Sequence, residues 1–168
     1  MLIAVDKPLE LTSFDVVKRM KYVFPGEKIG HSGTLDPKAT GLMVLGIGKD
    51  TKKLTSLIGL DKEYETVIDF SKMSDTWDMG YWEKFEEYHL EHLQVPEIKS
   101  IIEKLSLLVP THLLPLPAFS AKKKEGKRLY SLARSGQEVA EMKMMHIHHF
   151  EVLAYAFPEL SLRLKVGS

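Results

Sequence analysis

The sequence contains no cysteine among its 168 residues. Disulfide bridges, zinc sites built on thiolates and a cysteine nucleophile are therefore excluded. It also lacks an excess of charge of either sign, because 23 Lys and Arg residues balance 23 Asp and Glu residues. A general nucleic-acid binder is usually basic overall, so net charge alone argues against that class and only the distribution of charge could favour it.

Long apolar runs are also missing, since none approaches the roughly 20 residues that a membrane-spanning helix needs. The N-terminus reaches a charge at Asp6, too soon for a signal peptide. Together with the lack of cysteine, this predicts a cytoplasmic protein that does not associate with membranes. A chain of this length suits one domain, which can fold without a disulfide or a structural metal.

Basic residues are concentrated in one segment, where Lys122–Arg128 holds five cations in seven residues. A smaller group comprises Lys49, Lys52 and Lys53, whereas acidic residues gather between Glu83 and Glu91. Each basic group fits either a solvated surface or a patch that binds phosphates, and charge alone does not choose between them.

The hydrophobic pattern predicts alternating helices and strands. Apolar or alternating runs predict strands over residues 2–5, 42–47, 63–70, 142–155 and 160–166. Helical spacing predicts helices capped by Ser13, capped by Asp50 or Thr51, starting at Pro96, and over residues 127–135. Residues 110–117 are predicted to form a loop. Strands that come singly and in pairs between helices predict an α+β fold with a mixed, largely antiparallel sheet flanked by helices.

The segment from Gly30 to Gly41 contains the richest group of candidate functional residues. Its three glycines allow tight turns and the close approach of a bulky ligand. Asp36 lies before Pro37, which restricts it to extended conformations. His31 could stack on a base or bind a phosphate. The segment is not a P-loop, because no Gly-Lys-Ser/Thr follows the glycines. The residues alone leave two readings open, a catalytic carboxylate or a turn that starts a helix.

The same segment resembles the signature loop of the TruB family of pseudouridine synthases and of its guide-RNA-dependent relatives. Further segments agree in the family's order, and the resemblance covers essentially the whole chain. They are Asp6–Pro8 with Thr12–Ser13, Asp61–Tyr64, and Pro117–Gly136. The stretch Ser74–Asp78 is more similar to the stand-alone bacterial enzyme than to the guide-dependent one.

This resemblance implies a pseudouridine synthase fold, with residues 1–168 forming an incomplete catalytic domain and no separate second domain. It implies an isomerase that converts the T-loop uridine at position 55 of tRNA to pseudouridine. The T-arm of tRNA would be the partner, and no cofactor or metal is expected. The pair His146 and His148 could in principle bind a metal, yet no carboxylate or cysteine pattern completes such a site.

The family pattern also implies roles for individual residues. Asp36 would be the catalytic aspartate, and Tyr64 would lie against the flipped uracil. On its strand, however, Tyr64 is most simply a packing aromatic. His31 would fill the space that displaced T-loop bases leave. The remaining implied substrate-binding positions are Lys7 and Pro8 at the site floor, Asp78 as a further carboxylate, and Lys122 and Lys127 in the RNA-facing stretch.

The family's next motif follows a strand like that over residues 160–166 and supplies a Tyr and an Arg, the latter pairing with the catalytic aspartate. This sequence ends at Gly167–Ser168, before the Tyr-x-Arg motif and the C-terminal RNA-binding domain. Arg163 and Lys165 lie nearby in the sequence but are not evident substitutes. We therefore expect an unpaired strand edge, and a second polypeptide could supply the missing part. The alternatives are a catalytically impaired T-loop RNA-binding module or a truncated or split-gene product.

Overall fold

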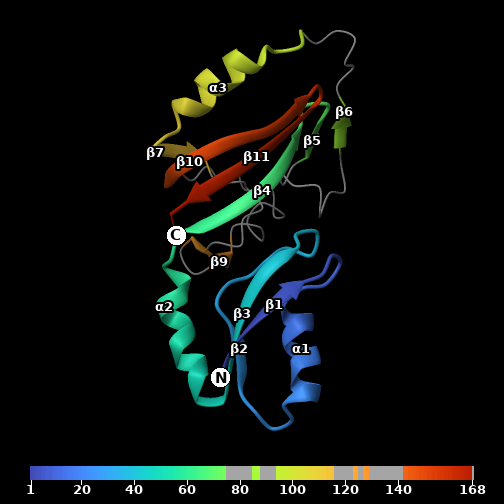
Figure 1. The fold of residues 1–168 in the computed structure, drawn as a ribbon, viewed down its shortest axis with the longest axis vertical. Coiled ribbons are helices and arrows are strands. Elements are labelled where there is room, and N and C mark those ends of the chain that lie inside the picture. Colours follow the sequence, from blue (N-terminus) through green and yellow to red (C-terminus); the bar gives the residue numbers. More distant parts are fainter. Residues whose placement is uncertain (75–84, 88–93, 116–122, 125–126, 129–141, 168) are drawn as a thin grey trace. The chain divides into compact units, whose positions relative to one another are not determined.

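The computed structural model describes residues 1–74, 85–87, 94–115, 123–124, 127–128 and 142–167. The chain divides into two compact units, Met1–Leu60 and Asp61–Ser168. The elements of the first unit, labelled in Figure 1, are β1 (Leu2–Lys7), α1 (Ser13–Val23), β2 (Ile29–His31), β3 (Gly41–Ile47), the 3-10 helix η1 (Gly48–Leu54) and α2 (Thr55–Ile58).

A three-stranded antiparallel sheet in the order β1-β3-β2 forms the first unit, as Figure 1 shows. The predicted strands over residues 2–5 and 42–47 are confirmed as β1 and β3. Helix α1 packs on the sheet through Val16 and Val17, which meet Met43 and Leu45 of β3 in one buried cluster. The glycine-rich loop runs between β2 and β3 of this packed sheet.

The N-cap of α1 is Thr12, so the prediction of Ser13 as the cap is wrong by one residue. The Thr12 hydroxyl accepts from the Asp15 backbone N–H at 3.0 Å, and the Asp15 carboxylate accepts from the Thr12 backbone N–H at 3.1 Å. These two bonds form a capping box, which satisfies two backbone donors at once. Ser13 becomes the first helical residue, and its hydroxyl is free for another partner.

The helix predicted after β3 starts as the 3-10 helix η1 and continues into the short α2. Neither Asp50 nor Thr51 caps it, contrary to the prediction. The Asp50 carboxylate instead pairs with Lys53 at 2.9 Å and with the N-terminal amine at 3.1 Å. The hydrogen bond from Lys53 and then that from the N-terminus lower the pKa of Asp50. Leu54 is buried, whereas Ile58 is exposed.

The second unit is built on a four-stranded antiparallel sheet in the order β4-β11-β10-β7. Its other elements within the described residues are short strands and the helix α3. The bounds are β4 (Lys62–Asp69), β5 (Lys72–Ser74), β6 (Phe85–Glu87), α3 (Ile98–Ser106), β7 (Thr111–Pro115), β8 (Lys123–Lys124), β9 (Lys127–Arg128), β10 (Met142–Ala156) and β11 (Glu159–Val166).

Strand β11 lies between β4 and β10 and is paired on both sides along its length. The expected unpaired edge is therefore not at this last strand. Leu160 and Leu162 of β11 are buried, while Ser161, Arg163 and Lys165 alternate with them, as the sequence pattern predicted. Every strand pair in the described part of the chain is antiparallel, and the predicted α+β organisation is confirmed.

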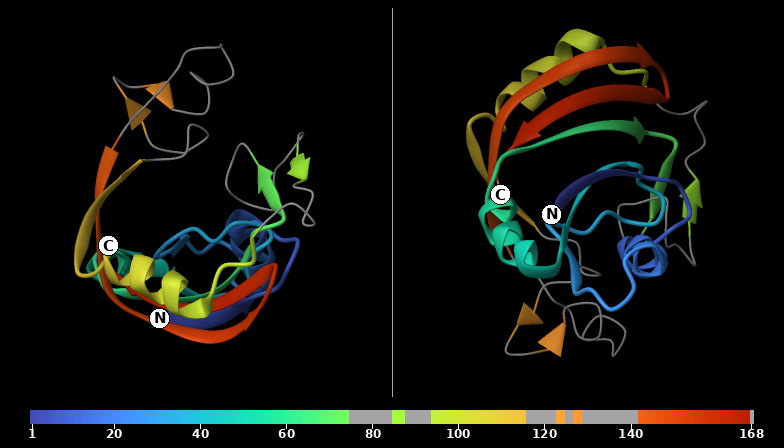
Figure 2. Two further views of the ribbon diagram at one scale, coloured as in Figure 1. Left: turned by 90° about the horizontal axis from the view of Figure 1, so that it is seen from above. Right: turned by 60° about the horizontal axis from the view of Figure 1, so that its bottom comes forward.

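Helix α3 lies along β10 and β11 in both views of Figure 2, and it packs on the face of the sheet that holds Leu160 and Leu162. Its Ile101 packs with Leu160 and Leu162. The helix predicted to start at Pro96 begins at Ile98, and the Pro96 carbonyl instead accepts a hydrogen bond from the Tyr155 hydroxyl at 2.7 Å. No helix in the described ranges is long and apolar enough to cross a membrane.

The predicted loop over residues 110–117 is wrong for its first half, which forms the edge strand β7 and pairs with the start of β10. Its Pro115 lies at the end of an edge strand, a place where proline is tolerated. The helix predicted over residues 127–135 begins instead as strand β9, which pairs with β8. The rest of that prediction lies outside the described residues.

Candidate active site

Asp36 lies in the loop that joins β2 to β3, and the residue before it is fixed by a buried serine. The Leu35 backbone N–H donates to Ser13 Oγ at 2.9 Å, and the Ser13 hydroxyl donates to the Leu35 carbonyl at 3.0 Å. Ser13 is 3% exposed, so water cannot compete for either bond. One side chain of α1 thus holds both polar backbone groups of Leu35.

The residue after Asp36 is fixed from the turn that follows β1. The Pro37 carbonyl accepts from the Glu10 backbone N–H at 2.8 Å and from Lys7 Nζ at 3.4 Å. Lys7 Nζ also donates to the carbonyls of Pro8 at 2.9 Å and Leu11 at 2.7 Å. All three donors of its ammonium are therefore used within hydrogen-bond distance.

Lys7 is completely buried, with 0% of its surface exposed. Its Nζ donates to three backbone carbonyls, which satisfy its donors without a carboxylate. A buried cation is costly unless its donors are satisfied, so the turn over residues 8–11 and the Asp36 loop must keep these carbonyls in place. The resemblance implied that Lys7 and Pro8 shape the floor of the site, and in the structure Lys7 Nζ contacts the carbonyls of Pro8 and of Pro37, the residue after Asp36.

The Asp36 side chain itself is exposed. Its backbone carbonyl accepts from the Ala39 N–H at 3.0 Å, which closes a turn over residues 36–39. The loop thus presents a solvent-accessible carboxylate on a backbone fixed on both sides. Such a group can act as a nucleophile or as a general base toward a substrate that reaches the loop.

His31 ends β2 at the start of the same loop and is half-buried. Its Nδ1 lies 2.7 Å from the Gly33 carbonyl, so Nδ1 is the donor in that bond. In a neutral ring Nε2 is then left as an acceptor. The first unit therefore holds Lys7 and His31 at the ends of β1 and β2, Pro8 in the turn after β1, and Asp36 in the glycine-rich loop.

The other predicted positions belong to the second unit. Tyr64 lies on β4 opposite Leu164 of β11, and it is 46% exposed, so half of the residue is accessible to a stacking partner. Asp78 and Lys122 lie outside the described residues. Lys127 lies in β9, directly opposite Lys124 of β8.

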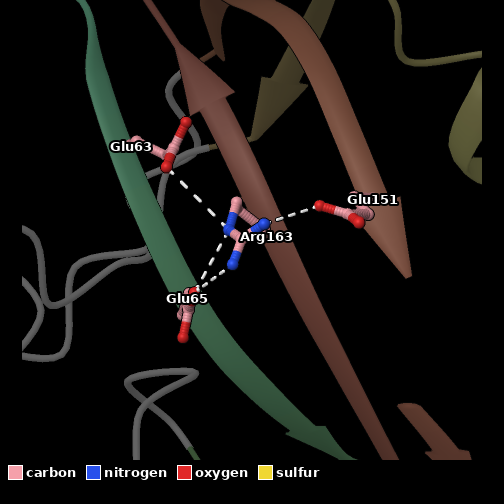
Figure 3. Close-up of polar contacts among 4 residues, drawn as sticks. All are labelled: Glu63, Glu65, Glu151 and Arg163. Atoms are coloured by element: carbon pink, nitrogen blue, oxygen red, sulfur yellow. Dashed lines mark hydrogen bonds and ion pairs between the residues drawn. The ribbon is translucent and has the colours of Figure 1, made fainter. Parts of the chain in front are cut away.

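Arg163, close in sequence to the expected Arg position, is engaged on the polar face of the sheet (Figure 3). Its guanidinium lies 2.7 Å from both the Glu65 and the Glu151 carboxylates and 3.9 Å from that of Glu63. The hydrogen bond to Glu65, followed by the charges of Glu151 and Glu65, raises the pKa of Arg163. The Arg163 guanidinium is thus already paired with three carboxylates of its own unit.

Two residues at the Asp36 loop were not predicted from the sequence. Ser13 was assigned to the helix cap, and Glu10 was given no role. The adjacent pair Thr12–Ser13 offered a signal for the first, because only one hydroxyl can be the cap. No sequence signal indicates Glu10, whose contact with Pro37 is made by its backbone. No group of three metal-ligating side chains occurs within the part of the chain that the structure describes.

The family profile described as "TruB family pseudouridylate synthase (N terminal domain)" matches residues 21–168. A protein of Chlorobium luteolum named tRNA pseudouridine synthase B is 42% identical over 170 residues, covering 96% of this chain and 57% of that protein. One of the same name from Chlorobaculum tepidum is 38% identical, covering 97% of this chain and 69% of its relative. The chain thus spans between about half and two thirds of these relatives.

Solved structures agree on the fold. A chain in the crystal structure of a Cbf5-Nop10-Gar1 complex superposes with a TM-score of 0.70 at 24% identity, covering 99% of this chain and 39% of that one. A chain of an H/ACA RNP bound to a substrate RNA containing 2'-deoxyuridine gives a TM-score of 0.66 at 23% identity, covering 99% and 37%. By the match of its sequence over most of its length, the chain belongs to the TruB family of pseudouridylate synthases.

Proposed function

We propose that this chain forms the catalytic part of an enzyme that converts the T-loop uridine of tRNA, at position 55, to pseudouridine, with Asp36 as the catalytic carboxylate. The observation that carries the proposal is the exposed Asp36 side chain on a loop fixed at both neighbouring residues. The relatives named tRNA pseudouridine synthase B support the choice of reaction and substrate. An enzyme of this kind would act in the cytoplasm, where tRNA is found.

The reaction is an isomerisation and needs no other reactant. The bond from uracil N1 to ribose C1′ breaks, the base turns, and a bond forms from C5 to C1′. The hydrogen on C5 leaves as a proton, and N1 gains one, so atoms and charge balance. A carboxylate can assist by attack on C1′, by attack on the base, or by removing the C5 proton. Asp36 is available for any of these roles.

The target nucleotide must leave its stack before a loop residue can reach it, which costs a few kcal/mol. Stacking on an aromatic ring returns roughly 1–3 kcal/mol per base. We assign this role to Tyr64, whose side chain keeps 46% of its surface exposed on β4. We assign to His31 the space that displaced T-loop bases leave, since its Nδ1 bond to Gly33 fixes the ring within the same loop.

The decisive experiment replaces one oxygen of the proposed catalytic group. Asp36→Asn keeps the size of the side chain but removes its charge, so it should abolish pseudouridine formation while leaving tRNA affinity unchanged. Tritium at uridine C5 is released to water only when the new carbon–carbon bond forms, so its release measures the reaction. Glu103→Gln, on the exposed side of α3, is the matched control and should keep full activity. Normal tritium release by Asp36→Asn would remove Asp36 from the role.

The hairpin of β8 and β9 supports RNA as the partner. Its register places Lys123 opposite Arg128 and Lys124 opposite Lys127. Like charges directly across two strands are destabilising, so four paired cations suit a surface that meets a polyanion. We propose that this hairpin, with Lys122, contacts phosphates rather than bases.

The salt dependence of tRNA affinity tests this assignment. Each phosphate contact contributes a slope of about 0.9 on duplex and about 0.7 on single strands. Replacing Lys123 and Lys124 by Gln should therefore flatten the slope, whereas the same change at the exposed Lys99 and Lys104 of α3 should not. An unchanged slope in the first variant would place the hairpin away from the RNA.

A second candidate function is T-loop binding without turnover. It is favoured by one observation, that Arg163 is held by three glutamates and so is occupied elsewhere. Tritium release by the 168-residue chain, alone and with a Tyr-x-Arg segment added in cis or as a second polypeptide, separates the two. Release only with the segment would show that the catalytic site is completed by it, and binding without release in both cases would establish the second function.

A further inference from the structure

The turn between β1 and α1 contains a backbone conformation that its residue rarely adopts. Glu10 has φ +65°, in the left-handed region, and it is the one non-glycine residue with positive φ in the described part of the chain. A side chain at Cβ disfavours this region, which glycine occupies freely. Local contacts must therefore hold Glu10 in place.

Both contacts of Glu10 reach the segment that directly follows Asp36. Its backbone N–H donates to the Pro37 carbonyl at 2.8 Å, and its carboxylate pairs with the Lys38 ammonium. Two successive residues after Asp36 are thus bound by one residue of the turn. Outliers of this kind are maintained only where the surrounding structure fixes them, and they are frequent at functional sites.

Lys7 and Glu10 hold different parts of this region in place. The two shorter bonds of Lys7 run to Pro8 and Leu11, within the turn itself, and its contact with Pro37 is its longest at 3.4 Å. Lys7 therefore shapes the turn, and Glu10 attaches the turn to the loop. We infer that Glu10 is a positioning residue for Asp36, acting through Pro37 and its ion pair with Lys38, an inference that rests on the proposed function.

A positioning role predicts a different signature from a stabilising one. The Glu10 and Lys38 side chains are 61% and 46% exposed, and ion pairs at such sites add little to stability. Small displacements of a reacting group, in contrast, can lower the rate of a reaction strongly. Loss of the pair should therefore slow the chemical step and leave global unfolding almost unchanged.

Glu10→Gly is the primary test because glycine accepts φ +65° and keeps the N–H that bonds Pro37, whereas the side chain and its ion pair with Lys38 are lost. In the protein that carries the proposed activity, single-turnover tritium release should fall about tenfold, with tRNA affinity and the thermal midpoint unchanged. Lys38→Met should cause the same loss, and combining the two should add nothing further. Exchanging the charges, Glu10→Lys with Lys38→Glu, should recover most of the rate.

Amide hydrogen exchange provides a readout that does not depend on activity. The Ala39 N–H donates to the Asp36 carbonyl, so its exchange reports the order of the loop. Glu10→Gly and Lys38→Met should both speed it. Faster exchange with full tritium release in Asp36→Asn would contradict the proposed function and keep the positioning role. Unchanged Ala39 exchange and unchanged rate in both variants would overturn the inference, as would weaker tRNA binding in Lys38→Met alone, which would assign Lys38 to a phosphate.

Discussion

Each unit of the chain contains a cation bound to three oxygen groups, and the two differ in almost every other respect. Lys7 is fully buried, and it donates to backbone carbonyls of the turn and of the Asp36 loop. The Arg163 side chain is 39% exposed, and its partners are carboxylates of Glu63, Glu65 and Glu151 on the polar face of the sheet. The contacts of Lys7 are therefore shielded from water, whereas those of Arg163 are open to water and salt.

The difference shows that burial of the cation, rather than pairing with opposite charges, decides how rigidly the groups around it are held. Carbonyls around Lys7 have no water to replace it, so losing the ammonium leaves them unsatisfied. Carboxylates around Arg163 are hydrated already, and salt screens their attraction to it. The loop that carries Asp36, the proposed catalytic residue, is thus held by the buried and more rigid contacts of Lys7.

The largest effect is expected for Lys7→Met, which keeps the shape of the side chain and removes its donors. The Pro8 and Leu11 carbonyls then lose a buried partner, at about 1–3 kcal/mol each. Part of this cost is offset because a buried charge is removed as well. We expect the free energy of unfolding to fall by roughly 2 kcal/mol or more in urea denaturation.

The control for this variant is Lys49→Met, at an exposed position in η1, which should unfold like the parent. Equal stability of Lys7→Met and the parent would show that the desolvation cost of the ammonium balances its hydrogen bonds. The comparison with Arg163 would then fail.

A somewhat smaller effect is expected for Ser13→Ala. This change removes the single partner of both Leu35 backbone groups, and each buried group left unsatisfied costs about 1–3 kcal/mol unless the loop shifts to reach water. Such a shift would also displace Asp36, so tritium release should fall with stability. Ser56→Ala, whose hydroxyl bonds the Lys53 carbonyl at an exposed site, is the control. A stable Ser13→Ala variant with full activity would show that Leu35 does not hold Asp36.

The sequence was informative where side chains themselves form the pattern. The alternation from Leu160 to Val166 predicted both the strand and its buried face, because strand side chains point to opposite faces in turn. The glycine-rich loop with Asp36 was also evident, since the residue types carry the signal. Pro110 and Pro117 suggested a loop between them, but pairing with β10 overrides this local preference and forms β7.

Most contacts that hold Asp36 could not be predicted because at least one partner in each is a backbone group. The resemblance placed Lys7 at the site floor, but its burial depends on backbone carbonyls, which every residue possesses. The positive φ of Glu10 is likewise set by Pro37 and Lys38, which are distant in the sequence. Only tertiary structure brings these groups together, so residue type gives no indication of them.

A smaller effect, present at neutral pH and lost at acid pH, is expected for Asp69 at the end of β4. The Ser71 hydroxyl and then the Ser71 backbone N–H donate to its carboxylate and lower the pKa of Asp69, against the opposing effect of burial. A lowered folded pKa means that the carboxylate stabilises the fold above its unfolded pKa of about 3.9, and that this contribution is lost as pH falls through the folded value.

Asp69→Asn should therefore lower the unfolding midpoint at neutral pH, and the difference from the parent should shrink as pH falls below about 4. Glu159→Gln, at the residue paired with Asp69 on β11, is the matched control and should show no such convergence. Parallel curves for Asp69→Asn and the parent down to the lowest pH would contradict the lowered pKa.

The smallest effect is expected for Arg163→Gln, even though it removes contacts with three carboxylates. Each of these is more than half exposed, so the attraction that is lost acts largely through water. The three glutamates left behind repel one another, and both terms weaken as the Debye length shortens from about 10 Å at 0.1 M salt to about 3 Å at 1 M. The thermal midpoint of the variant should therefore lie slightly below that of the parent at low salt and approach it at high salt.

Pairing Arg163→Gln with Glu65→Gln in a double-mutant cycle isolates the contact that contributes most. If Arg163→Gln instead destabilises the protein as much as Lys7→Met, and does so at every salt concentration, then exposure does not govern these two cations and the contrast between the units is wrong.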